Sequence, residues 1–159
     1  MPDLRRPHRG DSGFTLIELL VSMVLFGVLV GLSVAPYASY RLRQEHVGSA
    51  RELVSFLRRS QVRSVAEETT YRVDLTSTTA KMYRYNGTTY VLVQSTKPSN
   101  SKVTYTSISF AQPNGGLGSS IYFYAKGSAE KGSLTVSRSG SSKTYSISVE
   151  GLTARVSYA

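Results

Sequence analysis

The sequence predicts an α+β protein in which one long N-terminal helix packs on an antiparallel β-sheet or β-sandwich domain. Two observations predict this fold class. Apolar residues fill the segment 14–35 almost without interruption, and apolar residues then continue at helical spacing. From residue 67 onward, apolar and polar residues alternate in short runs separated by turn-forming residues. The expected organisation is a leader 1–13, a long helix 14–66 and a β-rich globular domain 67–159.

Composition excludes several kinds of site. The 159 residues include no cysteine and only two histidines, His8 and His46, which excludes disulfides, thiolate chemistry and the usual zinc sites. Neither histidine is placed for a catalytic triad, and the Gly115-Gly116 pair lacks the spacing of a phosphate-binding loop. We therefore expect no metal, no cofactor and no enzymatic activity.

The N-terminal region combines a short basic leader with a long apolar segment. Three arginines precede the apolar segment, and Glu18 is the only formal charge between residues 14 and 35. A helix of that length spans roughly 33 Å, enough for the hydrocarbon core of a bilayer. Gly27 and Gly31 form a small-xxx-small pair, on which helices can approach closely.

Three interpretations of this segment compete. A secretory signal peptide has a shorter apolar region, and the best cleavage site here, Ser33-Val34-Ala35, is followed by the unfavourable Pro36. A simple membrane anchor explains the length but not Glu18, because a carboxylate in a spanning helix costs about 2.5–3.5 kcal/mol on insertion scales. The third interpretation gives Glu18 a functional partner.

Residues 13–21, GFTLIELLV, resemble the class III signal peptide of type IV pilins and type II secretion pseudopilins. The resemblance implies that a prepilin peptidase cuts between Gly13 and Phe14 and that the new Phe14 amine is N-methylated. It also implies assembly with other pilins or pseudopilins into a helical filament, through an inner-membrane assembly platform. Glu18 of one subunit would then pair with the Phe14 amine of a neighbour and set the axial register. The alternative is that Glu18 only extends from the helix end to the membrane surface.

The helix is expected to change character at Pro36, which removes a backbone donor and favours a kink or local loss of helix. Beyond it, residues 40–66 predict an amphipathic helix that packs on the sheet. The expected apolar stripe consists of Val47, Ala50, Leu53, Val54, Leu57, Val62 and Val65. Six arginines on this segment predict a solvated face, with a nucleic-acid or membrane surface as the alternative.

Alternation of apolar and polar residues predicts about seven or eight short strands. Asn86-Gly87 predicts a type I′ hairpin turn, and residues 95–102 and 112–120 are expected to be a loop and a long turn. The expected strands are 71–75, 81–85, 89–93, 103–110, 121–124, 133–137, 143–149 and 154–158.

The second half also resembles the GspH/FimT-type minor pseudopilins, at residues 57–66, 121–128 and 145–156. The resemblance implies a structural role in priming or at the tip of a type IV pilus or type II secretion pseudopilus. It implies a single-pass protein in the bacterial inner membrane, in contact with lipid before assembly, with a periplasmic β domain. The sequence does not separate the two systems.

The alternative function is a pilus-associated receptor for DNA uptake. Residues 41–159 hold 16 Lys and Arg against 7 Asp and Glu, an excess that attracts polyanions. The candidate contacts are Arg155, Arg138 and Lys143 on the terminal strands. Relatives proposed to bind DNA have a Gly-Arg-x-Arg run, whereas here Gly151 is followed by Leu-Thr-Ala and only Arg155 remains.

Overall fold

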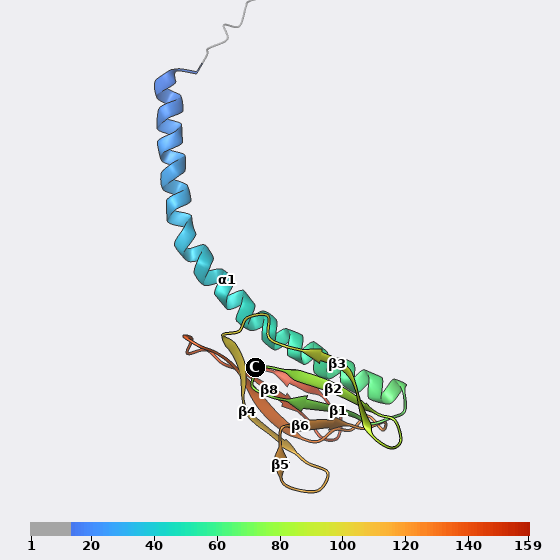
Figure 1. Cartoon of the computed structure of the whole chain (residues 1–159). Helices are drawn as coiled ribbons and strands as arrows, with labels where there is room; N and C mark the ends of the chain where they lie inside the picture. Colours follow the sequence, from blue (N-terminus) through green and yellow to red (C-terminus); the bar gives the residue numbers. More distant parts are fainter. Residues whose placement is uncertain (1–13) are drawn as a thin grey trace, which may run out of the picture. The chain divides into compact units, whose positions relative to one another are not determined.

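The structure is a computed structural model that describes residues 14–159 (Figure 1). Within this range the side chains at positions 33–36, 38, 39 and 42 are not described. The expectations for the leader, including Gly13, lie outside the described residues. The chain divides into two compact units, Met1–Tyr40 and Arg41–Ala159.

One helix, α1 (Leu16–Ala66), belongs to both units. Thr15 caps its start, because Oγ1 of Thr15 accepts a hydrogen bond from the backbone N–H of Glu18. The helix is continuous through position 36, so the loss of helix expected at Pro36 is not found. A proline removes only its own N–H from the ladder, and the flanking turns keep theirs.

The first unit carries apolar side chains on every side of its helix. From Phe14 to Leu32, all large apolar side chains are exposed, the least of them Val21 at 48%. Within the part of the chain that the structure describes, no helical stretch is both long and apolar enough to cross a membrane. The expected span 14–35 includes positions 33–35, whose side chains are not described, so it stays a prediction.

The second unit contains two antiparallel sheets, which confirms the α+β prediction. Sheet A has the order β3-β2-β1-β6, and sheet B has the order β5-β4-β7-β8-β9. The strands are β1 (Tyr71–Leu75), β2 (Ala80–Tyr85), β3 (Tyr90–Thr96), β4 (Val103–Ala111), β5 (Leu117–Gly118), β6 (Ser120–Phe123), β7 (Gly132–Arg138), β8 (Tyr145–Val149) and β9 (Val156–Tyr158). Compared with the expected strands, the structure adds β5 inside the long turn and starts β8 and β9 two residues later.

The core of the second unit is formed by one face of α1 and the inward faces of all the strands except β3 and β5. Ala50, Leu53, Val54 and Leu57 are buried as the stripe predicted, together with Phe56. Val62 and Val65 were expected in the stripe but are 65% and 47% exposed. The buried line continues through Ser60 and Ser64 instead, whose hydroxyls donate to helix carbonyls at Phe56 and Gln61. These small side chains permit close packing at the end of the helix.

The β2–β3 hairpin forms where the Asn86-Gly87 signal predicted it, but with a longer turn. Tyr85 pairs with Tyr90, which leaves four residues in the loop. Gly87 has a positive φ of 94°, whereas Asn86 does not have the positive φ that a type I′ turn needs. The Asn86 side chain instead accepts hydrogen bonds from the N–H groups of Thr88 and Thr89. The type I′ prediction was therefore wrong, because the asparagine caps the loop rather than entering the left-handed region.

Candidate functional site

The exposed N-terminal end of α1 carries the residues that the sequence singled out for processing and assembly. Phe14 is 80% exposed immediately before the helix. Glu18 is the acidic residue of the first turn, where a carboxylate interacts favourably with the helix dipole. Its backbone N–H lies 3.3 Å from Oγ1 of Thr15, and its carbonyl accepts a hydrogen bond from the Ser22 hydroxyl at 2.7 Å.

This arrangement suits lateral contact with other helices. A Cβ added at Gly27 or Gly31 would meet nothing within 4 Å, so the chain itself does not fill the space beside these glycines. Glu18 and the large apolar side chains of this segment are exposed as well. Apolar surface of this extent is the mark of an interaction site in an isolated subunit.

The three residues predicted to contact DNA do not form one cluster. Arg138 ends β7 and Lys143 precedes β8, near the pair of Val136 with Tyr145. Arg155 lies at the opposite end of β8, beside the pair of Val149 with Val156. The length of β8 separates the two positions by roughly 17 Å at 3.3 Å per residue.

Arginines of the helix are engaged within the second unit. Nη2 of Arg58 donates to the Val156 carbonyl at 3.0 Å, and Nε of Arg51 donates to the Tyr158 hydroxyl at 3.4 Å. Arg59 lies with its guanidinium carbon 5.9 Å from the centre of the Phe56 ring. The Arg58 and Arg51 contacts hold β9 against the helix and occupy donors that a ligand would otherwise use.

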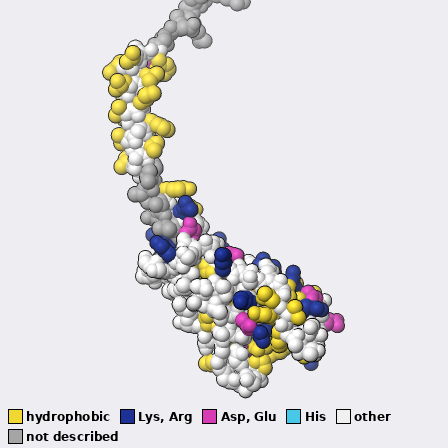
Figure 2. Space-filling view, in the orientation of Figure 1, with side chains coloured by type: hydrophobic (Ala, Val, Ile, Leu, Met, Phe, Trp, Pro, Cys, Tyr) yellow, Lys and Arg dark blue, Asp and Glu magenta, His cyan; other side chains and the backbone are white. Residues whose placement is uncertain are grey.

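The outer face of sheet A carries a cluster of tyrosines around Arg72. The guanidinium carbon lies 4.9 Å from the Tyr83 ring centre and 4.5 Å from the Tyr90 ring centre. Nη2 of Arg72 donates to Oδ2 of Asp74 at 3.0 Å. Figure 2 shows apolar side chains gathered over β1, β2 and β6 on this face, with charged side chains around them. Because the rings stack on Arg72, the cluster stabilises the sheet rather than offering free aromatic faces to bases.

Tyr124, which follows β6 in the same unit, forms a hydrogen bond with Glu130. Its hydroxyl donates to Oε1 of Glu130 at 2.6 Å. Burial, and then this hydrogen bond, raise the pKa of Tyr124 well above its ordinary value. The phenol is therefore held in its neutral, donating form.

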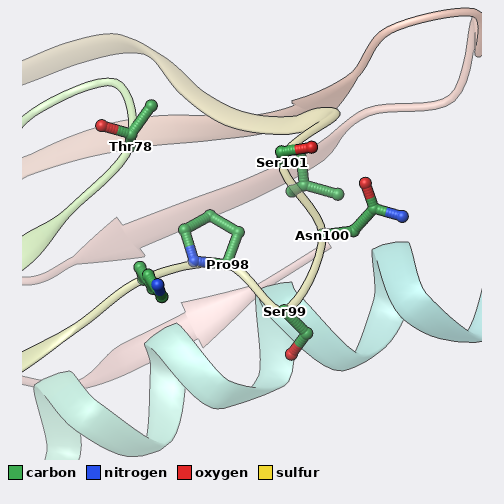
Figure 3. A pocket seen from close by; sticks show the side chains of 7 residues that line it. Thr78, Pro98, Ser99, Asn100 and Ser101 are labelled. Carbon is green, nitrogen blue, oxygen red and sulfur yellow. The ribbon is translucent and has the colours of Figure 1, made fainter.

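Two carboxylates of α1 hold the β3–β4 loop, which the sequence did not predict. Oε1 of Glu52 accepts from the Thr96 hydroxyl at 2.8 Å, and Oε2 of Glu45 accepts from the Asn100 amide at 2.6 Å. The Asn100 hydrogen bond is the main cause that lowers the pKa of Glu45. Figure 3 shows the loop passing over the helix beside a hollow lined by Thr78 and Pro98 to Ser101. The seven-residue spacing of the two glutamates on one helix face was the available signal.

His46, the histidine within the described residues, makes packing contacts. His46 is buried, with Nε2 3.3 Å from the Val136 carbonyl and its ring in edge contact with Tyr145 at 4.8 Å. In residues 14–159, no group of three or more potential ligands is arranged to hold a metal.

Comparison with known proteins gives two kinds of likeness. Residues 8–34 match the family described as the prokaryotic N-terminal methylation motif. No curated protein sequence matches the chain. The fold is similar to the type IV minor pilin FimU of Pseudomonas aeruginosa, with a TM-score of 0.58 and 11% identity over 76% of this chain and 92% of that one. It is also similar to the minor pseudopilin EpsH of the Vibrio cholerae type 2 secretion system, with a TM-score of 0.57 and 9% identity over 72% and 96%.

Proposed function

We propose that this chain is a member of the type IV pilin and pseudopilin superfamily, and that it is a minor subunit that enters its filament through the N-terminal helix; the match to the N-terminal methylation motif and the similarity of fold to two minor pilins support this. As such a subunit the chain would assemble with other pilins and would act as a structural protein rather than as an enzyme. The role would be in priming or at the tip of a type IV pilus or a type II secretion pseudopilus. The GspH/FimT-type subgroup is the one that the sequence resembles most.

The observation that supports this proposal is the exposed apolar surface of α1 between Phe14 and Leu32. A helix that is apolar on all sides is stable only where other helices or lipid surround it. These side chains are exposed in the single chain, and every buried apolar residue of the described chain lies between Ala50 and Val156. Helices of neighbouring subunits would cover this surface in the filament, and membrane lipid would cover it before assembly.

In such a bundle Glu18 would select the register between helices. A carboxylate surrounded by apolar side chains is strongly destabilising unless a cation lies beside it. Cleavage between Gly13 and Phe14 by a prepilin peptidase would create that cation as the amine of Phe14. Glu18 of one subunit would pair with the Phe14 amine of its neighbour, and Gly27 and Gly31 would permit close helix approach.

The proposal is tested by filament incorporation of Glu18→Ala. We expect processing and membrane fractionation to be unchanged, while the amount of the variant in sheared filaments falls sharply. Ser22→Ala is the matched control, because Ser22 is a polar residue one turn along the same helix whose hydroxyl bonds only to the helix backbone in the described chain. Normal incorporation of Glu18→Ala would show that Glu18 does not set the register.

The alternative, a receptor for DNA uptake, stays a prediction without a clustered site. Arg155 lies at one end of β8 and Lys143 at the other. A gel shift at low and high salt tests it, with Arg155→Ala and Lys143→Ala as the variants. Binding that weakens steeply with salt and with Arg155→Ala would support the alternative.

A further inference from the structure

The sequence contains two Asn-Gly pairs, and both lie in exposed turns of the second unit. Asn86-Gly87 forms part of the β2–β3 loop, and Asn114-Gly115 lies in the turn between β4 and β5. An asparagine before a glycine can react within the chain, because the glycine has no side chain to hinder the approach of its backbone nitrogen to the asparagine amide. Both pairs have this chemistry, so a difference between them must come from their surroundings.

The side-chain carbonyl of Asn86 is held by two backbone donors. Its Oδ1 accepts from the N–H of Thr88 at 3.0 Å and from the N–H of Thr89 at 2.8 Å. Donors at these distances stabilise the negative charge that develops on a carbonyl oxygen when a nucleophile attacks its carbon. The loop therefore activates Cγ of Asn86 toward attack.

The backbone nitrogen that follows Asn86 is available as the nucleophile. Among the described residues, the N–H of Gly87 donates to no acceptor, and a Cβ added at Gly87 would meet nothing within 4 Å. In the other pair, the N–H of Gly115 donates to the Gln112 carbonyl at 2.9 Å. That hydrogen bond must break before the Gly115 nitrogen can attack. The fold therefore favours the reaction at the first pair and opposes it at the second.

We propose that Asn86 is a site of spontaneous deamidation, promoted by the fold of the β2–β3 loop. The Gly87 nitrogen forms a bond to Cγ of Asn86, and the bond from Cγ to Nδ2 breaks. The proton of the Gly87 nitrogen passes through water to the leaving amide nitrogen, which departs as ammonia. Water then opens the cyclic succinimide at either carbonyl, which gives aspartate or isoaspartate. In sum, water is consumed and ammonia is released, with no oxidant or reductant.

The product alters the end of the hairpin. Isoaspartate lengthens the main chain by one carbon, and either product adds a carboxylate to the loop. The Asn86 N–H now donates to the Thr89 carbonyl at 3.0 Å, and the Tyr85 hydroxyl donates to the Gly87 carbonyl at 2.8 Å. Because both contacts depend on the present spacing of the backbone, we expect isoaspartate to break them. The site is separate from the helix surface of the proposed function, so either proposal can fail while the other holds.

Peptide mapping of the full chain, incubated in detergent micelles at alkaline pH, tests the proposal. Trypsin releases Asn86 in the peptide 85–102 and Asn114 in the peptide 103–126, and fragmentation locates the mass change from amide to carboxylate. We expect Asn86 to react about tenfold faster than Asn114, since one hydrogen bond is worth about that factor in rate. Isoaspartate should form beside aspartate, because both arise from the succinimide.

The same incubation in urea is the control for the sequence alone. Without the fold, two asparagines that each precede a glycine should react at nearly equal rates. A ratio of rates that is the same with and without urea would overturn the proposal, as would faster reaction at Asn114 in the folded chain. A product that is aspartate alone would also overturn it, because direct hydrolysis of the amide does not pass through the ring.

A variant of the loop tests the backbone donors. Thr88→Pro removes the N–H that bonds to Oδ1 of Asn86. We expect deamidation at Asn86 to slow, while the rate at Asn114 in the same molecules stays unchanged. Thermal unfolding checks that the variant keeps its fold, and the comparison with urea carries the test if it does not. An unchanged rate at Asn86 in the folded variant would show that the loop does not activate this side chain.

Discussion

Replacing Gly132 with alanine should destabilise the globular unit strongly. Gly132 opens β7, between Phe110 of β4 and Val149 of β8. An added Cβ would lie 2.3 Å from the Ser109 carbonyl oxygen and 2.5 Å from the Phe110 Cα. Both are backbone atoms of the adjacent strand, so relief requires β4 to move away from β7. The bulge of β4 between Thr106 and Ser109 brings this backbone close.

The expected loss follows from the cost of overpacking. Inserting a methyl group into a packed site costs about 1–3 kcal/mol, and the upper end applies because the clashing atoms are backbone. For a unit of this size, 3 kcal/mol lowers the melting temperature by roughly 10 °C. The assay is thermal and urea unfolding of the Arg41–Ala159 unit, followed by circular dichroism.

The same substitution at Gly48 provides the matched control. Gly48 lies in α1, and its added Cβ would meet nothing within 4 Å. Alanine favours the helix over glycine by about 0.8–1.0 kcal/mol, so Gly48→Ala should raise the melting temperature. If Gly132→Ala is as stable as the natural sequence, or if both variants change stability in the same direction, the close contact between β4 and β7 does not exist in solution.

Three further perturbations test contacts within the same unit. Arg58→Ala should lower the free energy of unfolding by about 1–2 kcal/mol, since the Val156 carbonyl loses a charged donor; faster amide exchange in β9 checks the location. Burial raises the pKa of Tyr105 to about 12. The contribution of this phenol to the free energy of unfolding is therefore complete below its ordinary pKa of about 10, and it is lost as the pH rises toward 12. Spectrophotometric titration measures this step, which Tyr105→Phe should remove. Asn100→Ala should raise the pKa of Glu45, because the Asn100 hydrogen bond is the main cause that lowers it. The lowered pKa stabilises the fold at pH values above the ordinary glutamate pKa, and this stabilisation is lost as the pH falls. An NMR titration that gives Glu45 the same pKa in the variant would contradict the assignment.

Periodicity predicted most of the fold because it reports directly on burial. The helix and the alternating strands follow from the spacing of residues such as Leu53, Leu57, Val73 and Ile121, all of which are buried. Val62 stands five positions after Leu57, off the buried line that continues through Ser60 and Ser64, and it is exposed. Because these two serines are polar, the spacing of apolar residues alone did not identify them as the end of the buried line.

Side-chain contacts between distant elements could not be predicted from spacing. Arg155 and Lys143 are twelve positions apart in sequence, and the register of β8 with β9 places them at opposite ends of a strand. Likewise, the attachment of Asn100 to Glu45 depends on where the β3–β4 loop crosses the helix. In contrast, the N-terminal motif can be recognised from local sequence alone, and residues 8–34 match the prokaryotic N-terminal methylation motif.

The mature N-terminus tests the central claim most directly. Mass spectrometry of the protein purified from the membrane or filament fraction of its natural host should recover an N-terminal peptide that begins at Phe14 and carries one methyl group on its amine. The Gly13→Leu variant should accumulate as an uncleaved, membrane-associated precursor, which verifies that cleavage depends on this position. Recovery of a natural N-terminus at Pro36 or Ser39 would contradict the account, because the apolar helix would then have been removed as an ordinary signal peptide.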